Sequence, residues 1–166
     1  MKKIIVAISL LLLTACTNGN STLNKLKEDY PIVKEEVEKL PKDIQNELVV
    51  PDKLPFDVKN VSIEVGADPR QKTYDHTSFK YTDGKGVILY VTTIHPKNND
   101  FGKNQKNTTK LNDGTKVIID RDDEKAKIIR WKKQGHYREL MLIISPDVDA
   151  NYTIKDLIKV ADSINY

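Results

Sequence analysis

The stretch AKIIRWKKQGHYRELMLII, residues 126–144, decides the fold of this chain. Two runs rich in β-branched and aromatic residues flank Gln134-Gly135, and a polar residue followed by glycine favours a tight turn. The stretch therefore predicts a β-hairpin with strands at residues 126–133 and 136–144. Residues 140–144 are apolar at consecutive positions, so we expect both faces of the second strand to be covered.

Five further segments with the character of strands precede this hairpin. Apolar residues alternate with polar ones or run continuously in each, and turn-forming residues separate most of them. The segments are 61–65, 77–81, 87–94, 108–111 and 116–120, with turns at 83–86, 112–114 and 122–125 and a polar loop at 95–107. Short turns join antiparallel strands, whereas parallel pairs need long crossovers. We therefore expect an antiparallel meander of about six strands.

A helical segment is predicted at residues 23–48. Apolar residues recur there every three or four positions, which is typical of an amphipathic helix. Proline is tolerated in the first turn of a helix and interrupts its interior, so Pro31 and Pro41 divide the segment. We expect one helix at residues 31–39 and a second short helix that ends near Leu48.

The chain closes with another predicted helix. Thr153 and Asp156 have the spacing of a capping box, and the residues that follow form one apolar face. One helix covers only one face of a sheet. Three things could cover the second face: the N-terminal helices, curling of the sheet on itself, or an apolar ligand or partner. Of these we expect cover from within the chain. The predicted fold is α+β, with residues 23–48 and 49–166 forming one globular unit.

Length and composition exclude several classes of protein. The chain has 166 residues, enough for one domain, and 39% of them are hydrophobic, with a mean hydropathy of -0.51. These values are typical of a soluble globular body rather than a membrane bundle or a disordered chain. Lys and Arg number 27 against 24 Asp and Glu. This near-balance argues against nucleic acid as a partner, because binding of nucleic acid needs a clustered basic face.

The first residues carry an export signal. Lys2 and Lys3 precede an apolar run at residues 4–13, which is too short to span a bilayer and has the length of a signal-peptide core. Leu13-Thr14-Ala15-Cys16 resembles the bacterial lipobox. The resemblance implies that residues 1–15 are cleaved off between Ala15 and Cys16, and that a diacylglycerol is attached to the Cys16 thiol.

The lipobox resemblance implies a location at the extracytoplasmic face of a bacterial, Gram-positive cell membrane. Two or more fatty chains hold a protein stably to a bilayer, since each buried methylene contributes about 0.8 kcal/mol. The residues that follow Cys16 are small and polar, so we expect residues 16–22 to be a flexible tether. Cys16 is the only cysteine, so an intrachain disulfide and a thiolate zinc site are excluded.

The globular part carries a second resemblance, over residues 50–164. Its short motifs are similar to an uncharacterised extracytoplasmic domain of Firmicute lipoproteins and of membrane-bound proteins that resemble anti-sigma factors. The resemblance implies an antiparallel sheet with a packed C-terminal helix, and it supplies no catalytic residues. The motifs are Leu54-Pro55-Phe56, residues 111–115, Ile129-Arg130-Trp131 with Tyr137 and Leu140, and residues 153–164.

No complete catalytic or metal-binding motif is present in the sequence. His76, His95 and His136 lack the spacing that places two imidazoles on one metal, and we expect ordinary surface or strand histidines. Asp147-x-Asp149-x-Asn151 begins like a calcium loop, but the required glycine and glutamate do not follow. We therefore predict no catalytic residue, no metal and no cofactor.

Aromatic residues supply the candidate ligand contacts. Tyr81, Tyr90, Trp131 and Tyr137 lie in predicted strands, where they form a binding surface or pack in the core. The sequence favours a non-enzymatic module of the cell envelope that binds a protein, a peptide or an apolar ligand. The alternatives are a hydrolase of envelope polymer, with acids from separate strands, and a structural or immunity-type lipoprotein.

The lipid anchor is directly testable. In growing cells, radiolabelled palmitate is expected to enter this protein, and the mature chain is expected to begin at Cys16, because acylation precedes cleavage in the lipoprotein route. Autoradiography and N-terminal mass determination check both. An unlabelled product, or one that begins at another residue, would contradict the anchor.

Overall fold

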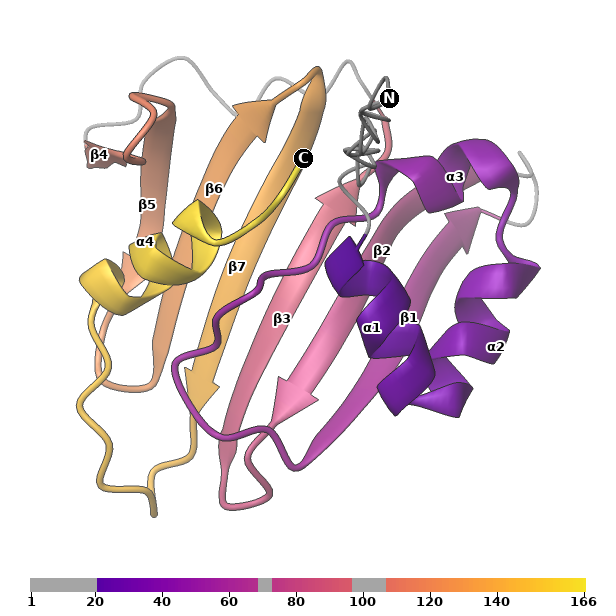
Figure 1. The fold of residues 1–166 in the computed structure, drawn as a ribbon. Coiled ribbons are helices and arrows are strands. Elements are labelled where there is room, and N and C mark those ends of the chain that lie inside the picture. Colours follow the sequence, from indigo (N-terminus) through magenta and orange to yellow (C-terminus); the bar gives the residue numbers. More distant parts are fainter. Residues whose placement is uncertain (1–20, 69–72, 97–106) are drawn as a thin grey trace, which may run out of the picture.

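A seven-stranded antiparallel sheet is the centre of the computed structural model, which describes residues 21–68, 73–96 and 107–166 (Figure 1). The predicted α+β class is confirmed, with seven strands in place of about six. The strands are β1 (Asn60–Asp68), β2 (Thr73–Thr82), β3 (Val87–Ile94), β4 (Thr108–Lys110), β5 (Lys116–Asp122), β6 (Ala126–Lys133) and β7 (His136–Ile144).

The strand order is β1-β2-β3-β7-β6-β5-β4, which corrects the predicted meander. Strands β1 to β3 form one meander, and β4 to β7 form a second that runs back until β7 pairs with β3. The connection between β3 and β4, residues 95–107, is too long for the short-turn argument to apply. The predicted turns at 83–86, 112–114, 122–125 and 134–135 each join two paired strands. Gln134 and Gly135 adopt positive φ angles of 52° and 82°, as a tight hairpin turn requires.

Three short helices precede the sheet: α1 (Ser21–Asp29), α2 (Pro31–Lys39) and α3 (Lys42–Glu47). Pro31 stands at the start of α2 and Pro41 precedes α3, as predicted. Helix α1 begins at Ser21, so the last two residues of the predicted tether are helical. The signal segment with Ala15 and Cys16 lies outside the described residues, as does most of the 95–107 loop. None of the described helices has the length and apolar character needed to cross a membrane.

All four helices lie on the same face of the sheet (Figure 1). Helix α2 contacts β1, and the C-terminal helix α4 (Ile154–Asp162) contacts β6 and β7. The predicted capping box at Thr153 and Asp156 is present, with 3.0 Å between the backbone nitrogen of Thr153 and the Asp156 carboxylate. The core on this face is fully buried: Val33 and Val37 of α2, Leu157 of α4, and Phe79, Leu89, Ile129, Leu140 and Leu142 of the sheet.

The connection from α3 to β1 fills the space between the two groups of helices. It crosses the front of the sheet (Figure 1), and its residues Val49 and Val50 are buried. An isolated β-bridge joins Pro51 to Ile164, just after α4. The N-terminal and C-terminal parts of the cover are therefore tied together over the sheet.

No described element covers the other face of the sheet. Along β7, Leu140 and Leu142 are buried under the helices, whereas Met141 and Ile143 are half-buried on the opposite face. The expected internal cover of that second face is thus not found in the described part of the chain. One helix, about 10–12 Å wide, is too narrow for seven strands, whose six spacings of about 4.8 Å span roughly 29 Å. The N-terminal helices therefore lie on the same face as α4 and cover the part of it that α4 leaves open.

Neighbouring residues of β7 test this one-sided cover. Leu142→Ala should reduce the free energy of unfolding by about 2–5 kcal/mol, because it opens a cavity in a closed core. Ile143→Ala should cost less than half as much, since the Ile143 side chain is only half-buried. Urea unfolding of both variants measures the difference. Equal losses would mean that the second face is also closed.

Candidate functional site

The uncovered face of the sheet carries a hollow of about 610 Å³ over β1, β2, β3 and β7. Its volume lies within the range of about 300–1,000 Å³ that is typical of small-ligand sites. The lining combines apolar and acidic side chains, and none of the described residues that form it is Lys or Arg. The apolar residues are Tyr90, Ile94, Pro96, Met141 and Ile143, and the ionisable ones are Glu64, Asp75, His76 and Glu139.

Cross-strand pairing places the two glutamates of the hollow. Glu64 pairs with Ser78, Ser78 with Thr92 and Thr92 with Glu139, so one row of the sheet carries both carboxylates. Each glutamate has a basic neighbour on an adjacent strand: Lys80 lies 3.9 Å from Glu64, and Arg130 lies 3.8 Å from Glu139.

Burial raises the pKa of Glu139, and Arg130 opposes that rise. The hollow therefore has an apolar floor beside one partly desolvated acid, Glu139, and two exposed acids, Glu64 and Asp75. This arrangement fits a ligand with an apolar body and a positive group.

The four candidate aromatic residues do not form one surface. Tyr81 and Trp131 are 2% and 1% exposed and belong to the core under the helices. Tyr90 and Tyr137 lie on the uncovered face, since they are out of step with the buried residues of their strands. Tyr90 lines the hollow, whereas Tyr137 packs under Lys132, with 4.8 Å between the ammonium and the ring centre. Of the four aromatic residues predicted to contact a ligand, only Tyr90 lines the hollow.

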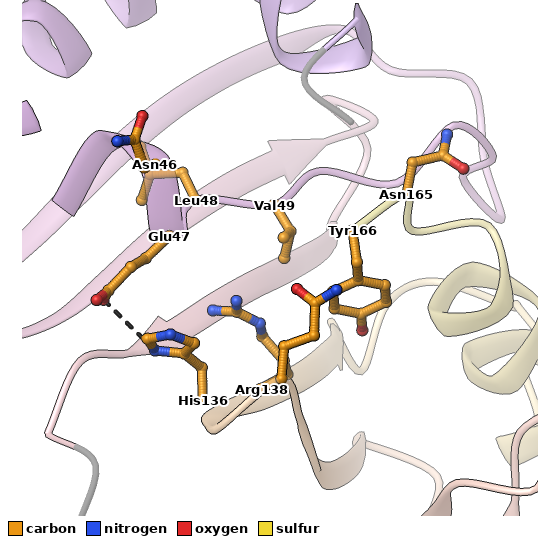
Figure 2. A pocket seen from close by; sticks show the side chains of 9 residues that line it. Asn46, Glu47, Leu48, Val49, His136, Arg138, Asn165 and Tyr166 are labelled. Atoms are coloured by element: carbon orange, nitrogen blue, oxygen red, sulfur yellow. Dashed lines mark ion pairs between the residues drawn. The ribbon is translucent and has the colours of Figure 1, made fainter. Parts of the chain in front are cut away.

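A buried polar network on the helix-covered side was not foreseen from the sequence. The Glu47 carboxylate lies 2.7 Å from His95 Nδ1, and His95 Nε2 lies 2.9 Å from the Thr77 hydroxyl. His136 Nδ1 lies 3.5 Å from the same glutamate oxygen (Figure 2). His95 is only 7% exposed, so it is not a surface histidine; it directly follows β3 and is buried with hydrogen-bond partners.

The order hydroxyl, imidazole, carboxylate is also that of a hydrolase triad. In this chain Thr77 is 0% exposed, so no substrate reaches its hydroxyl, and the network acts to hold α3 against the sheet. Four separate segments supply the members of the network, and sequence spacing does not predict that they meet. One signal was present: His95 continues the buried alternation of Val91 and Thr93 along β3, where a polar residue needs a partner.

The protonation of His95 follows from its surroundings. Burial lowers the pKa of this histidine, and the hydrogen bond to Glu47 opposes the fall. The imidazole is therefore neutral at neutral pH, with Nδ1–H donating to the Glu47 carboxylate and Nε2 accepting from Thr77. Within residues 21–68, 73–96 and 107–166, no three His, Cys, Asp or Glu side chains are placed to hold a metal ion.

These features define an α+β protein with helices on one face of its sheet and a ligand-sized hollow on the other. Comparisons with family models, curated proteins and solved structures find no match for the chain. The resemblance to the Firmicute extracytoplasmic domain therefore stays a prediction from its motifs.

The depressed pKa of His95 makes stability depend on pH. Between the folded pKa and the ordinary value of 6.5, the unfolded chain binds more protons than the native one, so stability falls as the pH drops below about 6.5 toward the folded pKa. The slope reaches at most about 1.4 kcal/mol per pH unit for one proton. His95→Gln should be less stable at pH 7.5 and should flatten this slope, whereas His76→Gln should keep it. Thermal melts at several pH values measure this dependence of stability on pH. An unchanged slope in His95→Gln would show that His95 is not its source.

Proposed function

We propose that this protein is a lipid-anchored, non-enzymatic binding module of the bacterial cell envelope, and that its ligand docks on the uncovered sheet face. The observation that carries the proposal is the one-sided cover, which leaves half-buried apolar side chains around a hollow of about 610 Å³. Apolar groups that a chain leaves open in one concave place mark interaction sites in soluble proteins.

The chemistry of the hollow favours an envelope protein or peptide as the ligand. Its floor accepts apolar side chains at Tyr90, Met141 and Ile143. Its acids, Glu64 and Glu139 among them, attract a Lys or Arg of the partner, and the described residues that line the hollow include no Lys or Arg. A small apolar ligand would use the floor alone and would be insensitive to these charges.

The proposed anchor restricts where that partner lies. Residues 17–20 separate Cys16 from helix α1, and the five steps from residue 16 to residue 21 span at most about 3.5 Å each, or roughly 17 Å in all. With Cys16 acylated, the sheet domain would stay within a short distance of the bilayer. The partner is then a membrane protein, another lipoprotein or a segment held close to the membrane.

Hydrolysis of envelope polymer, the alternative, has weaker support. Glycoside cleavage needs two carboxyl groups roughly 5–9.5 Å apart. Glu64 and Glu139 stand three strands apart, and three spacings of about 4.8 Å separate their backbones by about 14 Å. Their basic neighbours Lys80 and Arg130 belong to β2 and β6, so the pair shares no counterion that would draw it together.

Site-specific photo-crosslinking in living cells tests the docking face. Benzoylphenylalanine in place of Tyr90 should yield one adduct of defined mass, because this position lies at the floor of the hollow. The same probe at Ile32, which is 64% exposed on helix α2, serves as the matched control and should yield no such adduct.

A second substitution separates specific docking from chance capture. Glu64→Lys reverses one charge of the hollow and should lower the yield of the Tyr90 adduct severalfold. No adduct at Tyr90, or equal yields at both probe positions, would leave the structural or immunity-type lipoprotein as the better account. If the yield of the Tyr90 adduct is the same with Glu64→Lys as without it, a small apolar ligand is favoured over a basic partner.

A further inference from the structure

A second cavity, of about 200 Å³, lies near the polar network and apart from the hollow. The end of α3, the turn between β6 and β7, and the last residues of the chain enclose it (Figure 2). Its lining includes Asn46, Glu47, His136, Arg138 and Tyr166. None of these residues takes part in the proposed docking on the uncovered face.

Arg138 is the unusual member of this cavity. It is 2% exposed, and its cross-strand partners are Thr93 and Trp131 in the core under the helices. Its Nε and Nη1 atoms have no hydrogen-bond partner in the described part of the chain, and solvent does not reach them. A buried donor without a partner is costly, and more so when it carries a charge. Burial lowers the pKa of Arg138 to about 10, so the guanidinium is still protonated at neutral pH.

The one acid in the cavity does not satisfy this charge. The Glu47 carboxylate points toward His136 in Figure 2, and the same oxygen takes the short hydrogen bond from His95. Glu47 acts on Arg138 only as a charge at a distance. The guanidinium therefore has a partial counter-charge and no acceptor for its two buried donors.

The Tyr166 hydroxyl is a further donor of the cavity. Tyr166 Oη accepts a hydrogen bond from Trp131 Nε1 at 2.8 Å, which leaves the tyrosine hydrogen for another acceptor. Burial raises the pKa of Tyr166, so this hydrogen stays in place. The amides of Asn46 and Asn165 point away from the guanidinium in Figure 2, and Asn165 Nδ2 already donates to Asp52. A buried cation with two unmet donors, beside a tyrosine hydroxyl that can also donate, matches a ligand that brings acceptors and negative charge.

We propose that this cavity binds an oxyanion, the carboxylate or phosphate group of a small ligand, with Arg138 as its main contact. The planar guanidinium matches the paired oxygens of either group. The volume of about 200 Å³ limits the ligand to a few non-hydrogen atoms around that group. Because solvent does not reach Nε and Nη1, one lining side chain must move aside on binding. Gln134 is exposed at the tip of the hairpin turn and can do so without disturbing the core.

The full-length protein in detergent allows a direct test with acetate and inorganic phosphate as probes. Each is titrated at constant ionic strength, and the fluorescence of Trp131, the only tryptophan, is followed together with the melting temperature. Trp131 reports on the cavity through its hydrogen bond to Tyr166. We expect a saturable fluorescence change in the millimolar range, with a higher melting temperature in the presence of the anion.

Two arginine variants give the matched comparison. Arg138→Met should weaken anion binding at least about tenfold, and without anion it should melt no lower than the wild type, because an apolar side chain replaces a buried charge with unmet donors. Arg130→Met removes an equal charge from the uncovered face, where Arg130 pairs with Glu139, and should keep the response. Should Arg138→Met fail to fold, Arg138→Lys keeps the charge without the planar group and should bind severalfold more weakly.

The outcomes distinguish a carboxylate ligand from a phosphate ligand, and they show whether the proposal fails. A response to acetate alone identifies a carboxylate ligand, and a response to phosphate alone identifies a phosphate ligand; both support an oxyanion site. No saturable change up to about 100 mM of either probe would overturn it, since a charge-assisted site with several donors binds more tightly than that. Equal binding by the wild type and both Arg138 variants would overturn it as well.

Discussion

Burial of a single face of the sheet under four helices is the constraint on which the rest of this structure depends. Val37 of α2 and Leu157 of α4 are completely buried at opposite ends of that face, and the bridge from Pro51 to Ile164 closes the space between them. All the helical cover is used there. The alternate residues of the same strands, such as Tyr90 and Met141, are therefore left to form the hollow on the other side.

Local chemistry in the sequence was sufficient to place most elements but not to arrange them. Turn residues such as Gln134-Gly135 and the capping box at Thr153 act within a few positions, and the structure confirms them. The pairing of β3 with β7 depends on competition between distant segments, which no local pattern records. The one-sided cover was missed because Ile143 is apolar although it is half-buried, so the run at residues 140–144 imitates a strand buried on both faces.

The polar sites were missed for a related reason, although each left a trace. Glu47, His95 and Thr77 come from segments far apart in the chain, so spacing motifs do not connect them. Arg138 has the same parity along β7 as Leu140 and Leu142, which places a charged side chain on the buried face. A charge at a core position of an otherwise apolar alternation is a signal that sequence reasoning can use, because it demands a partner or a function.

The distribution of polar residues on the covered face argues that Arg138 serves a purpose other than stability. The cross-strand row through Phe79, Val91 and Leu140 is apolar and carries the packing. The next row contains Thr93 and Arg138, and it lies where α3 reaches the sheet through Glu47. Well-packed apolar side chains of similar volume are often as stable as buried ions or more so. A buried cation with unmet donors beside a cavity is thus a local cost that the apolar rows offset, and such costs concentrate where a protein binds something.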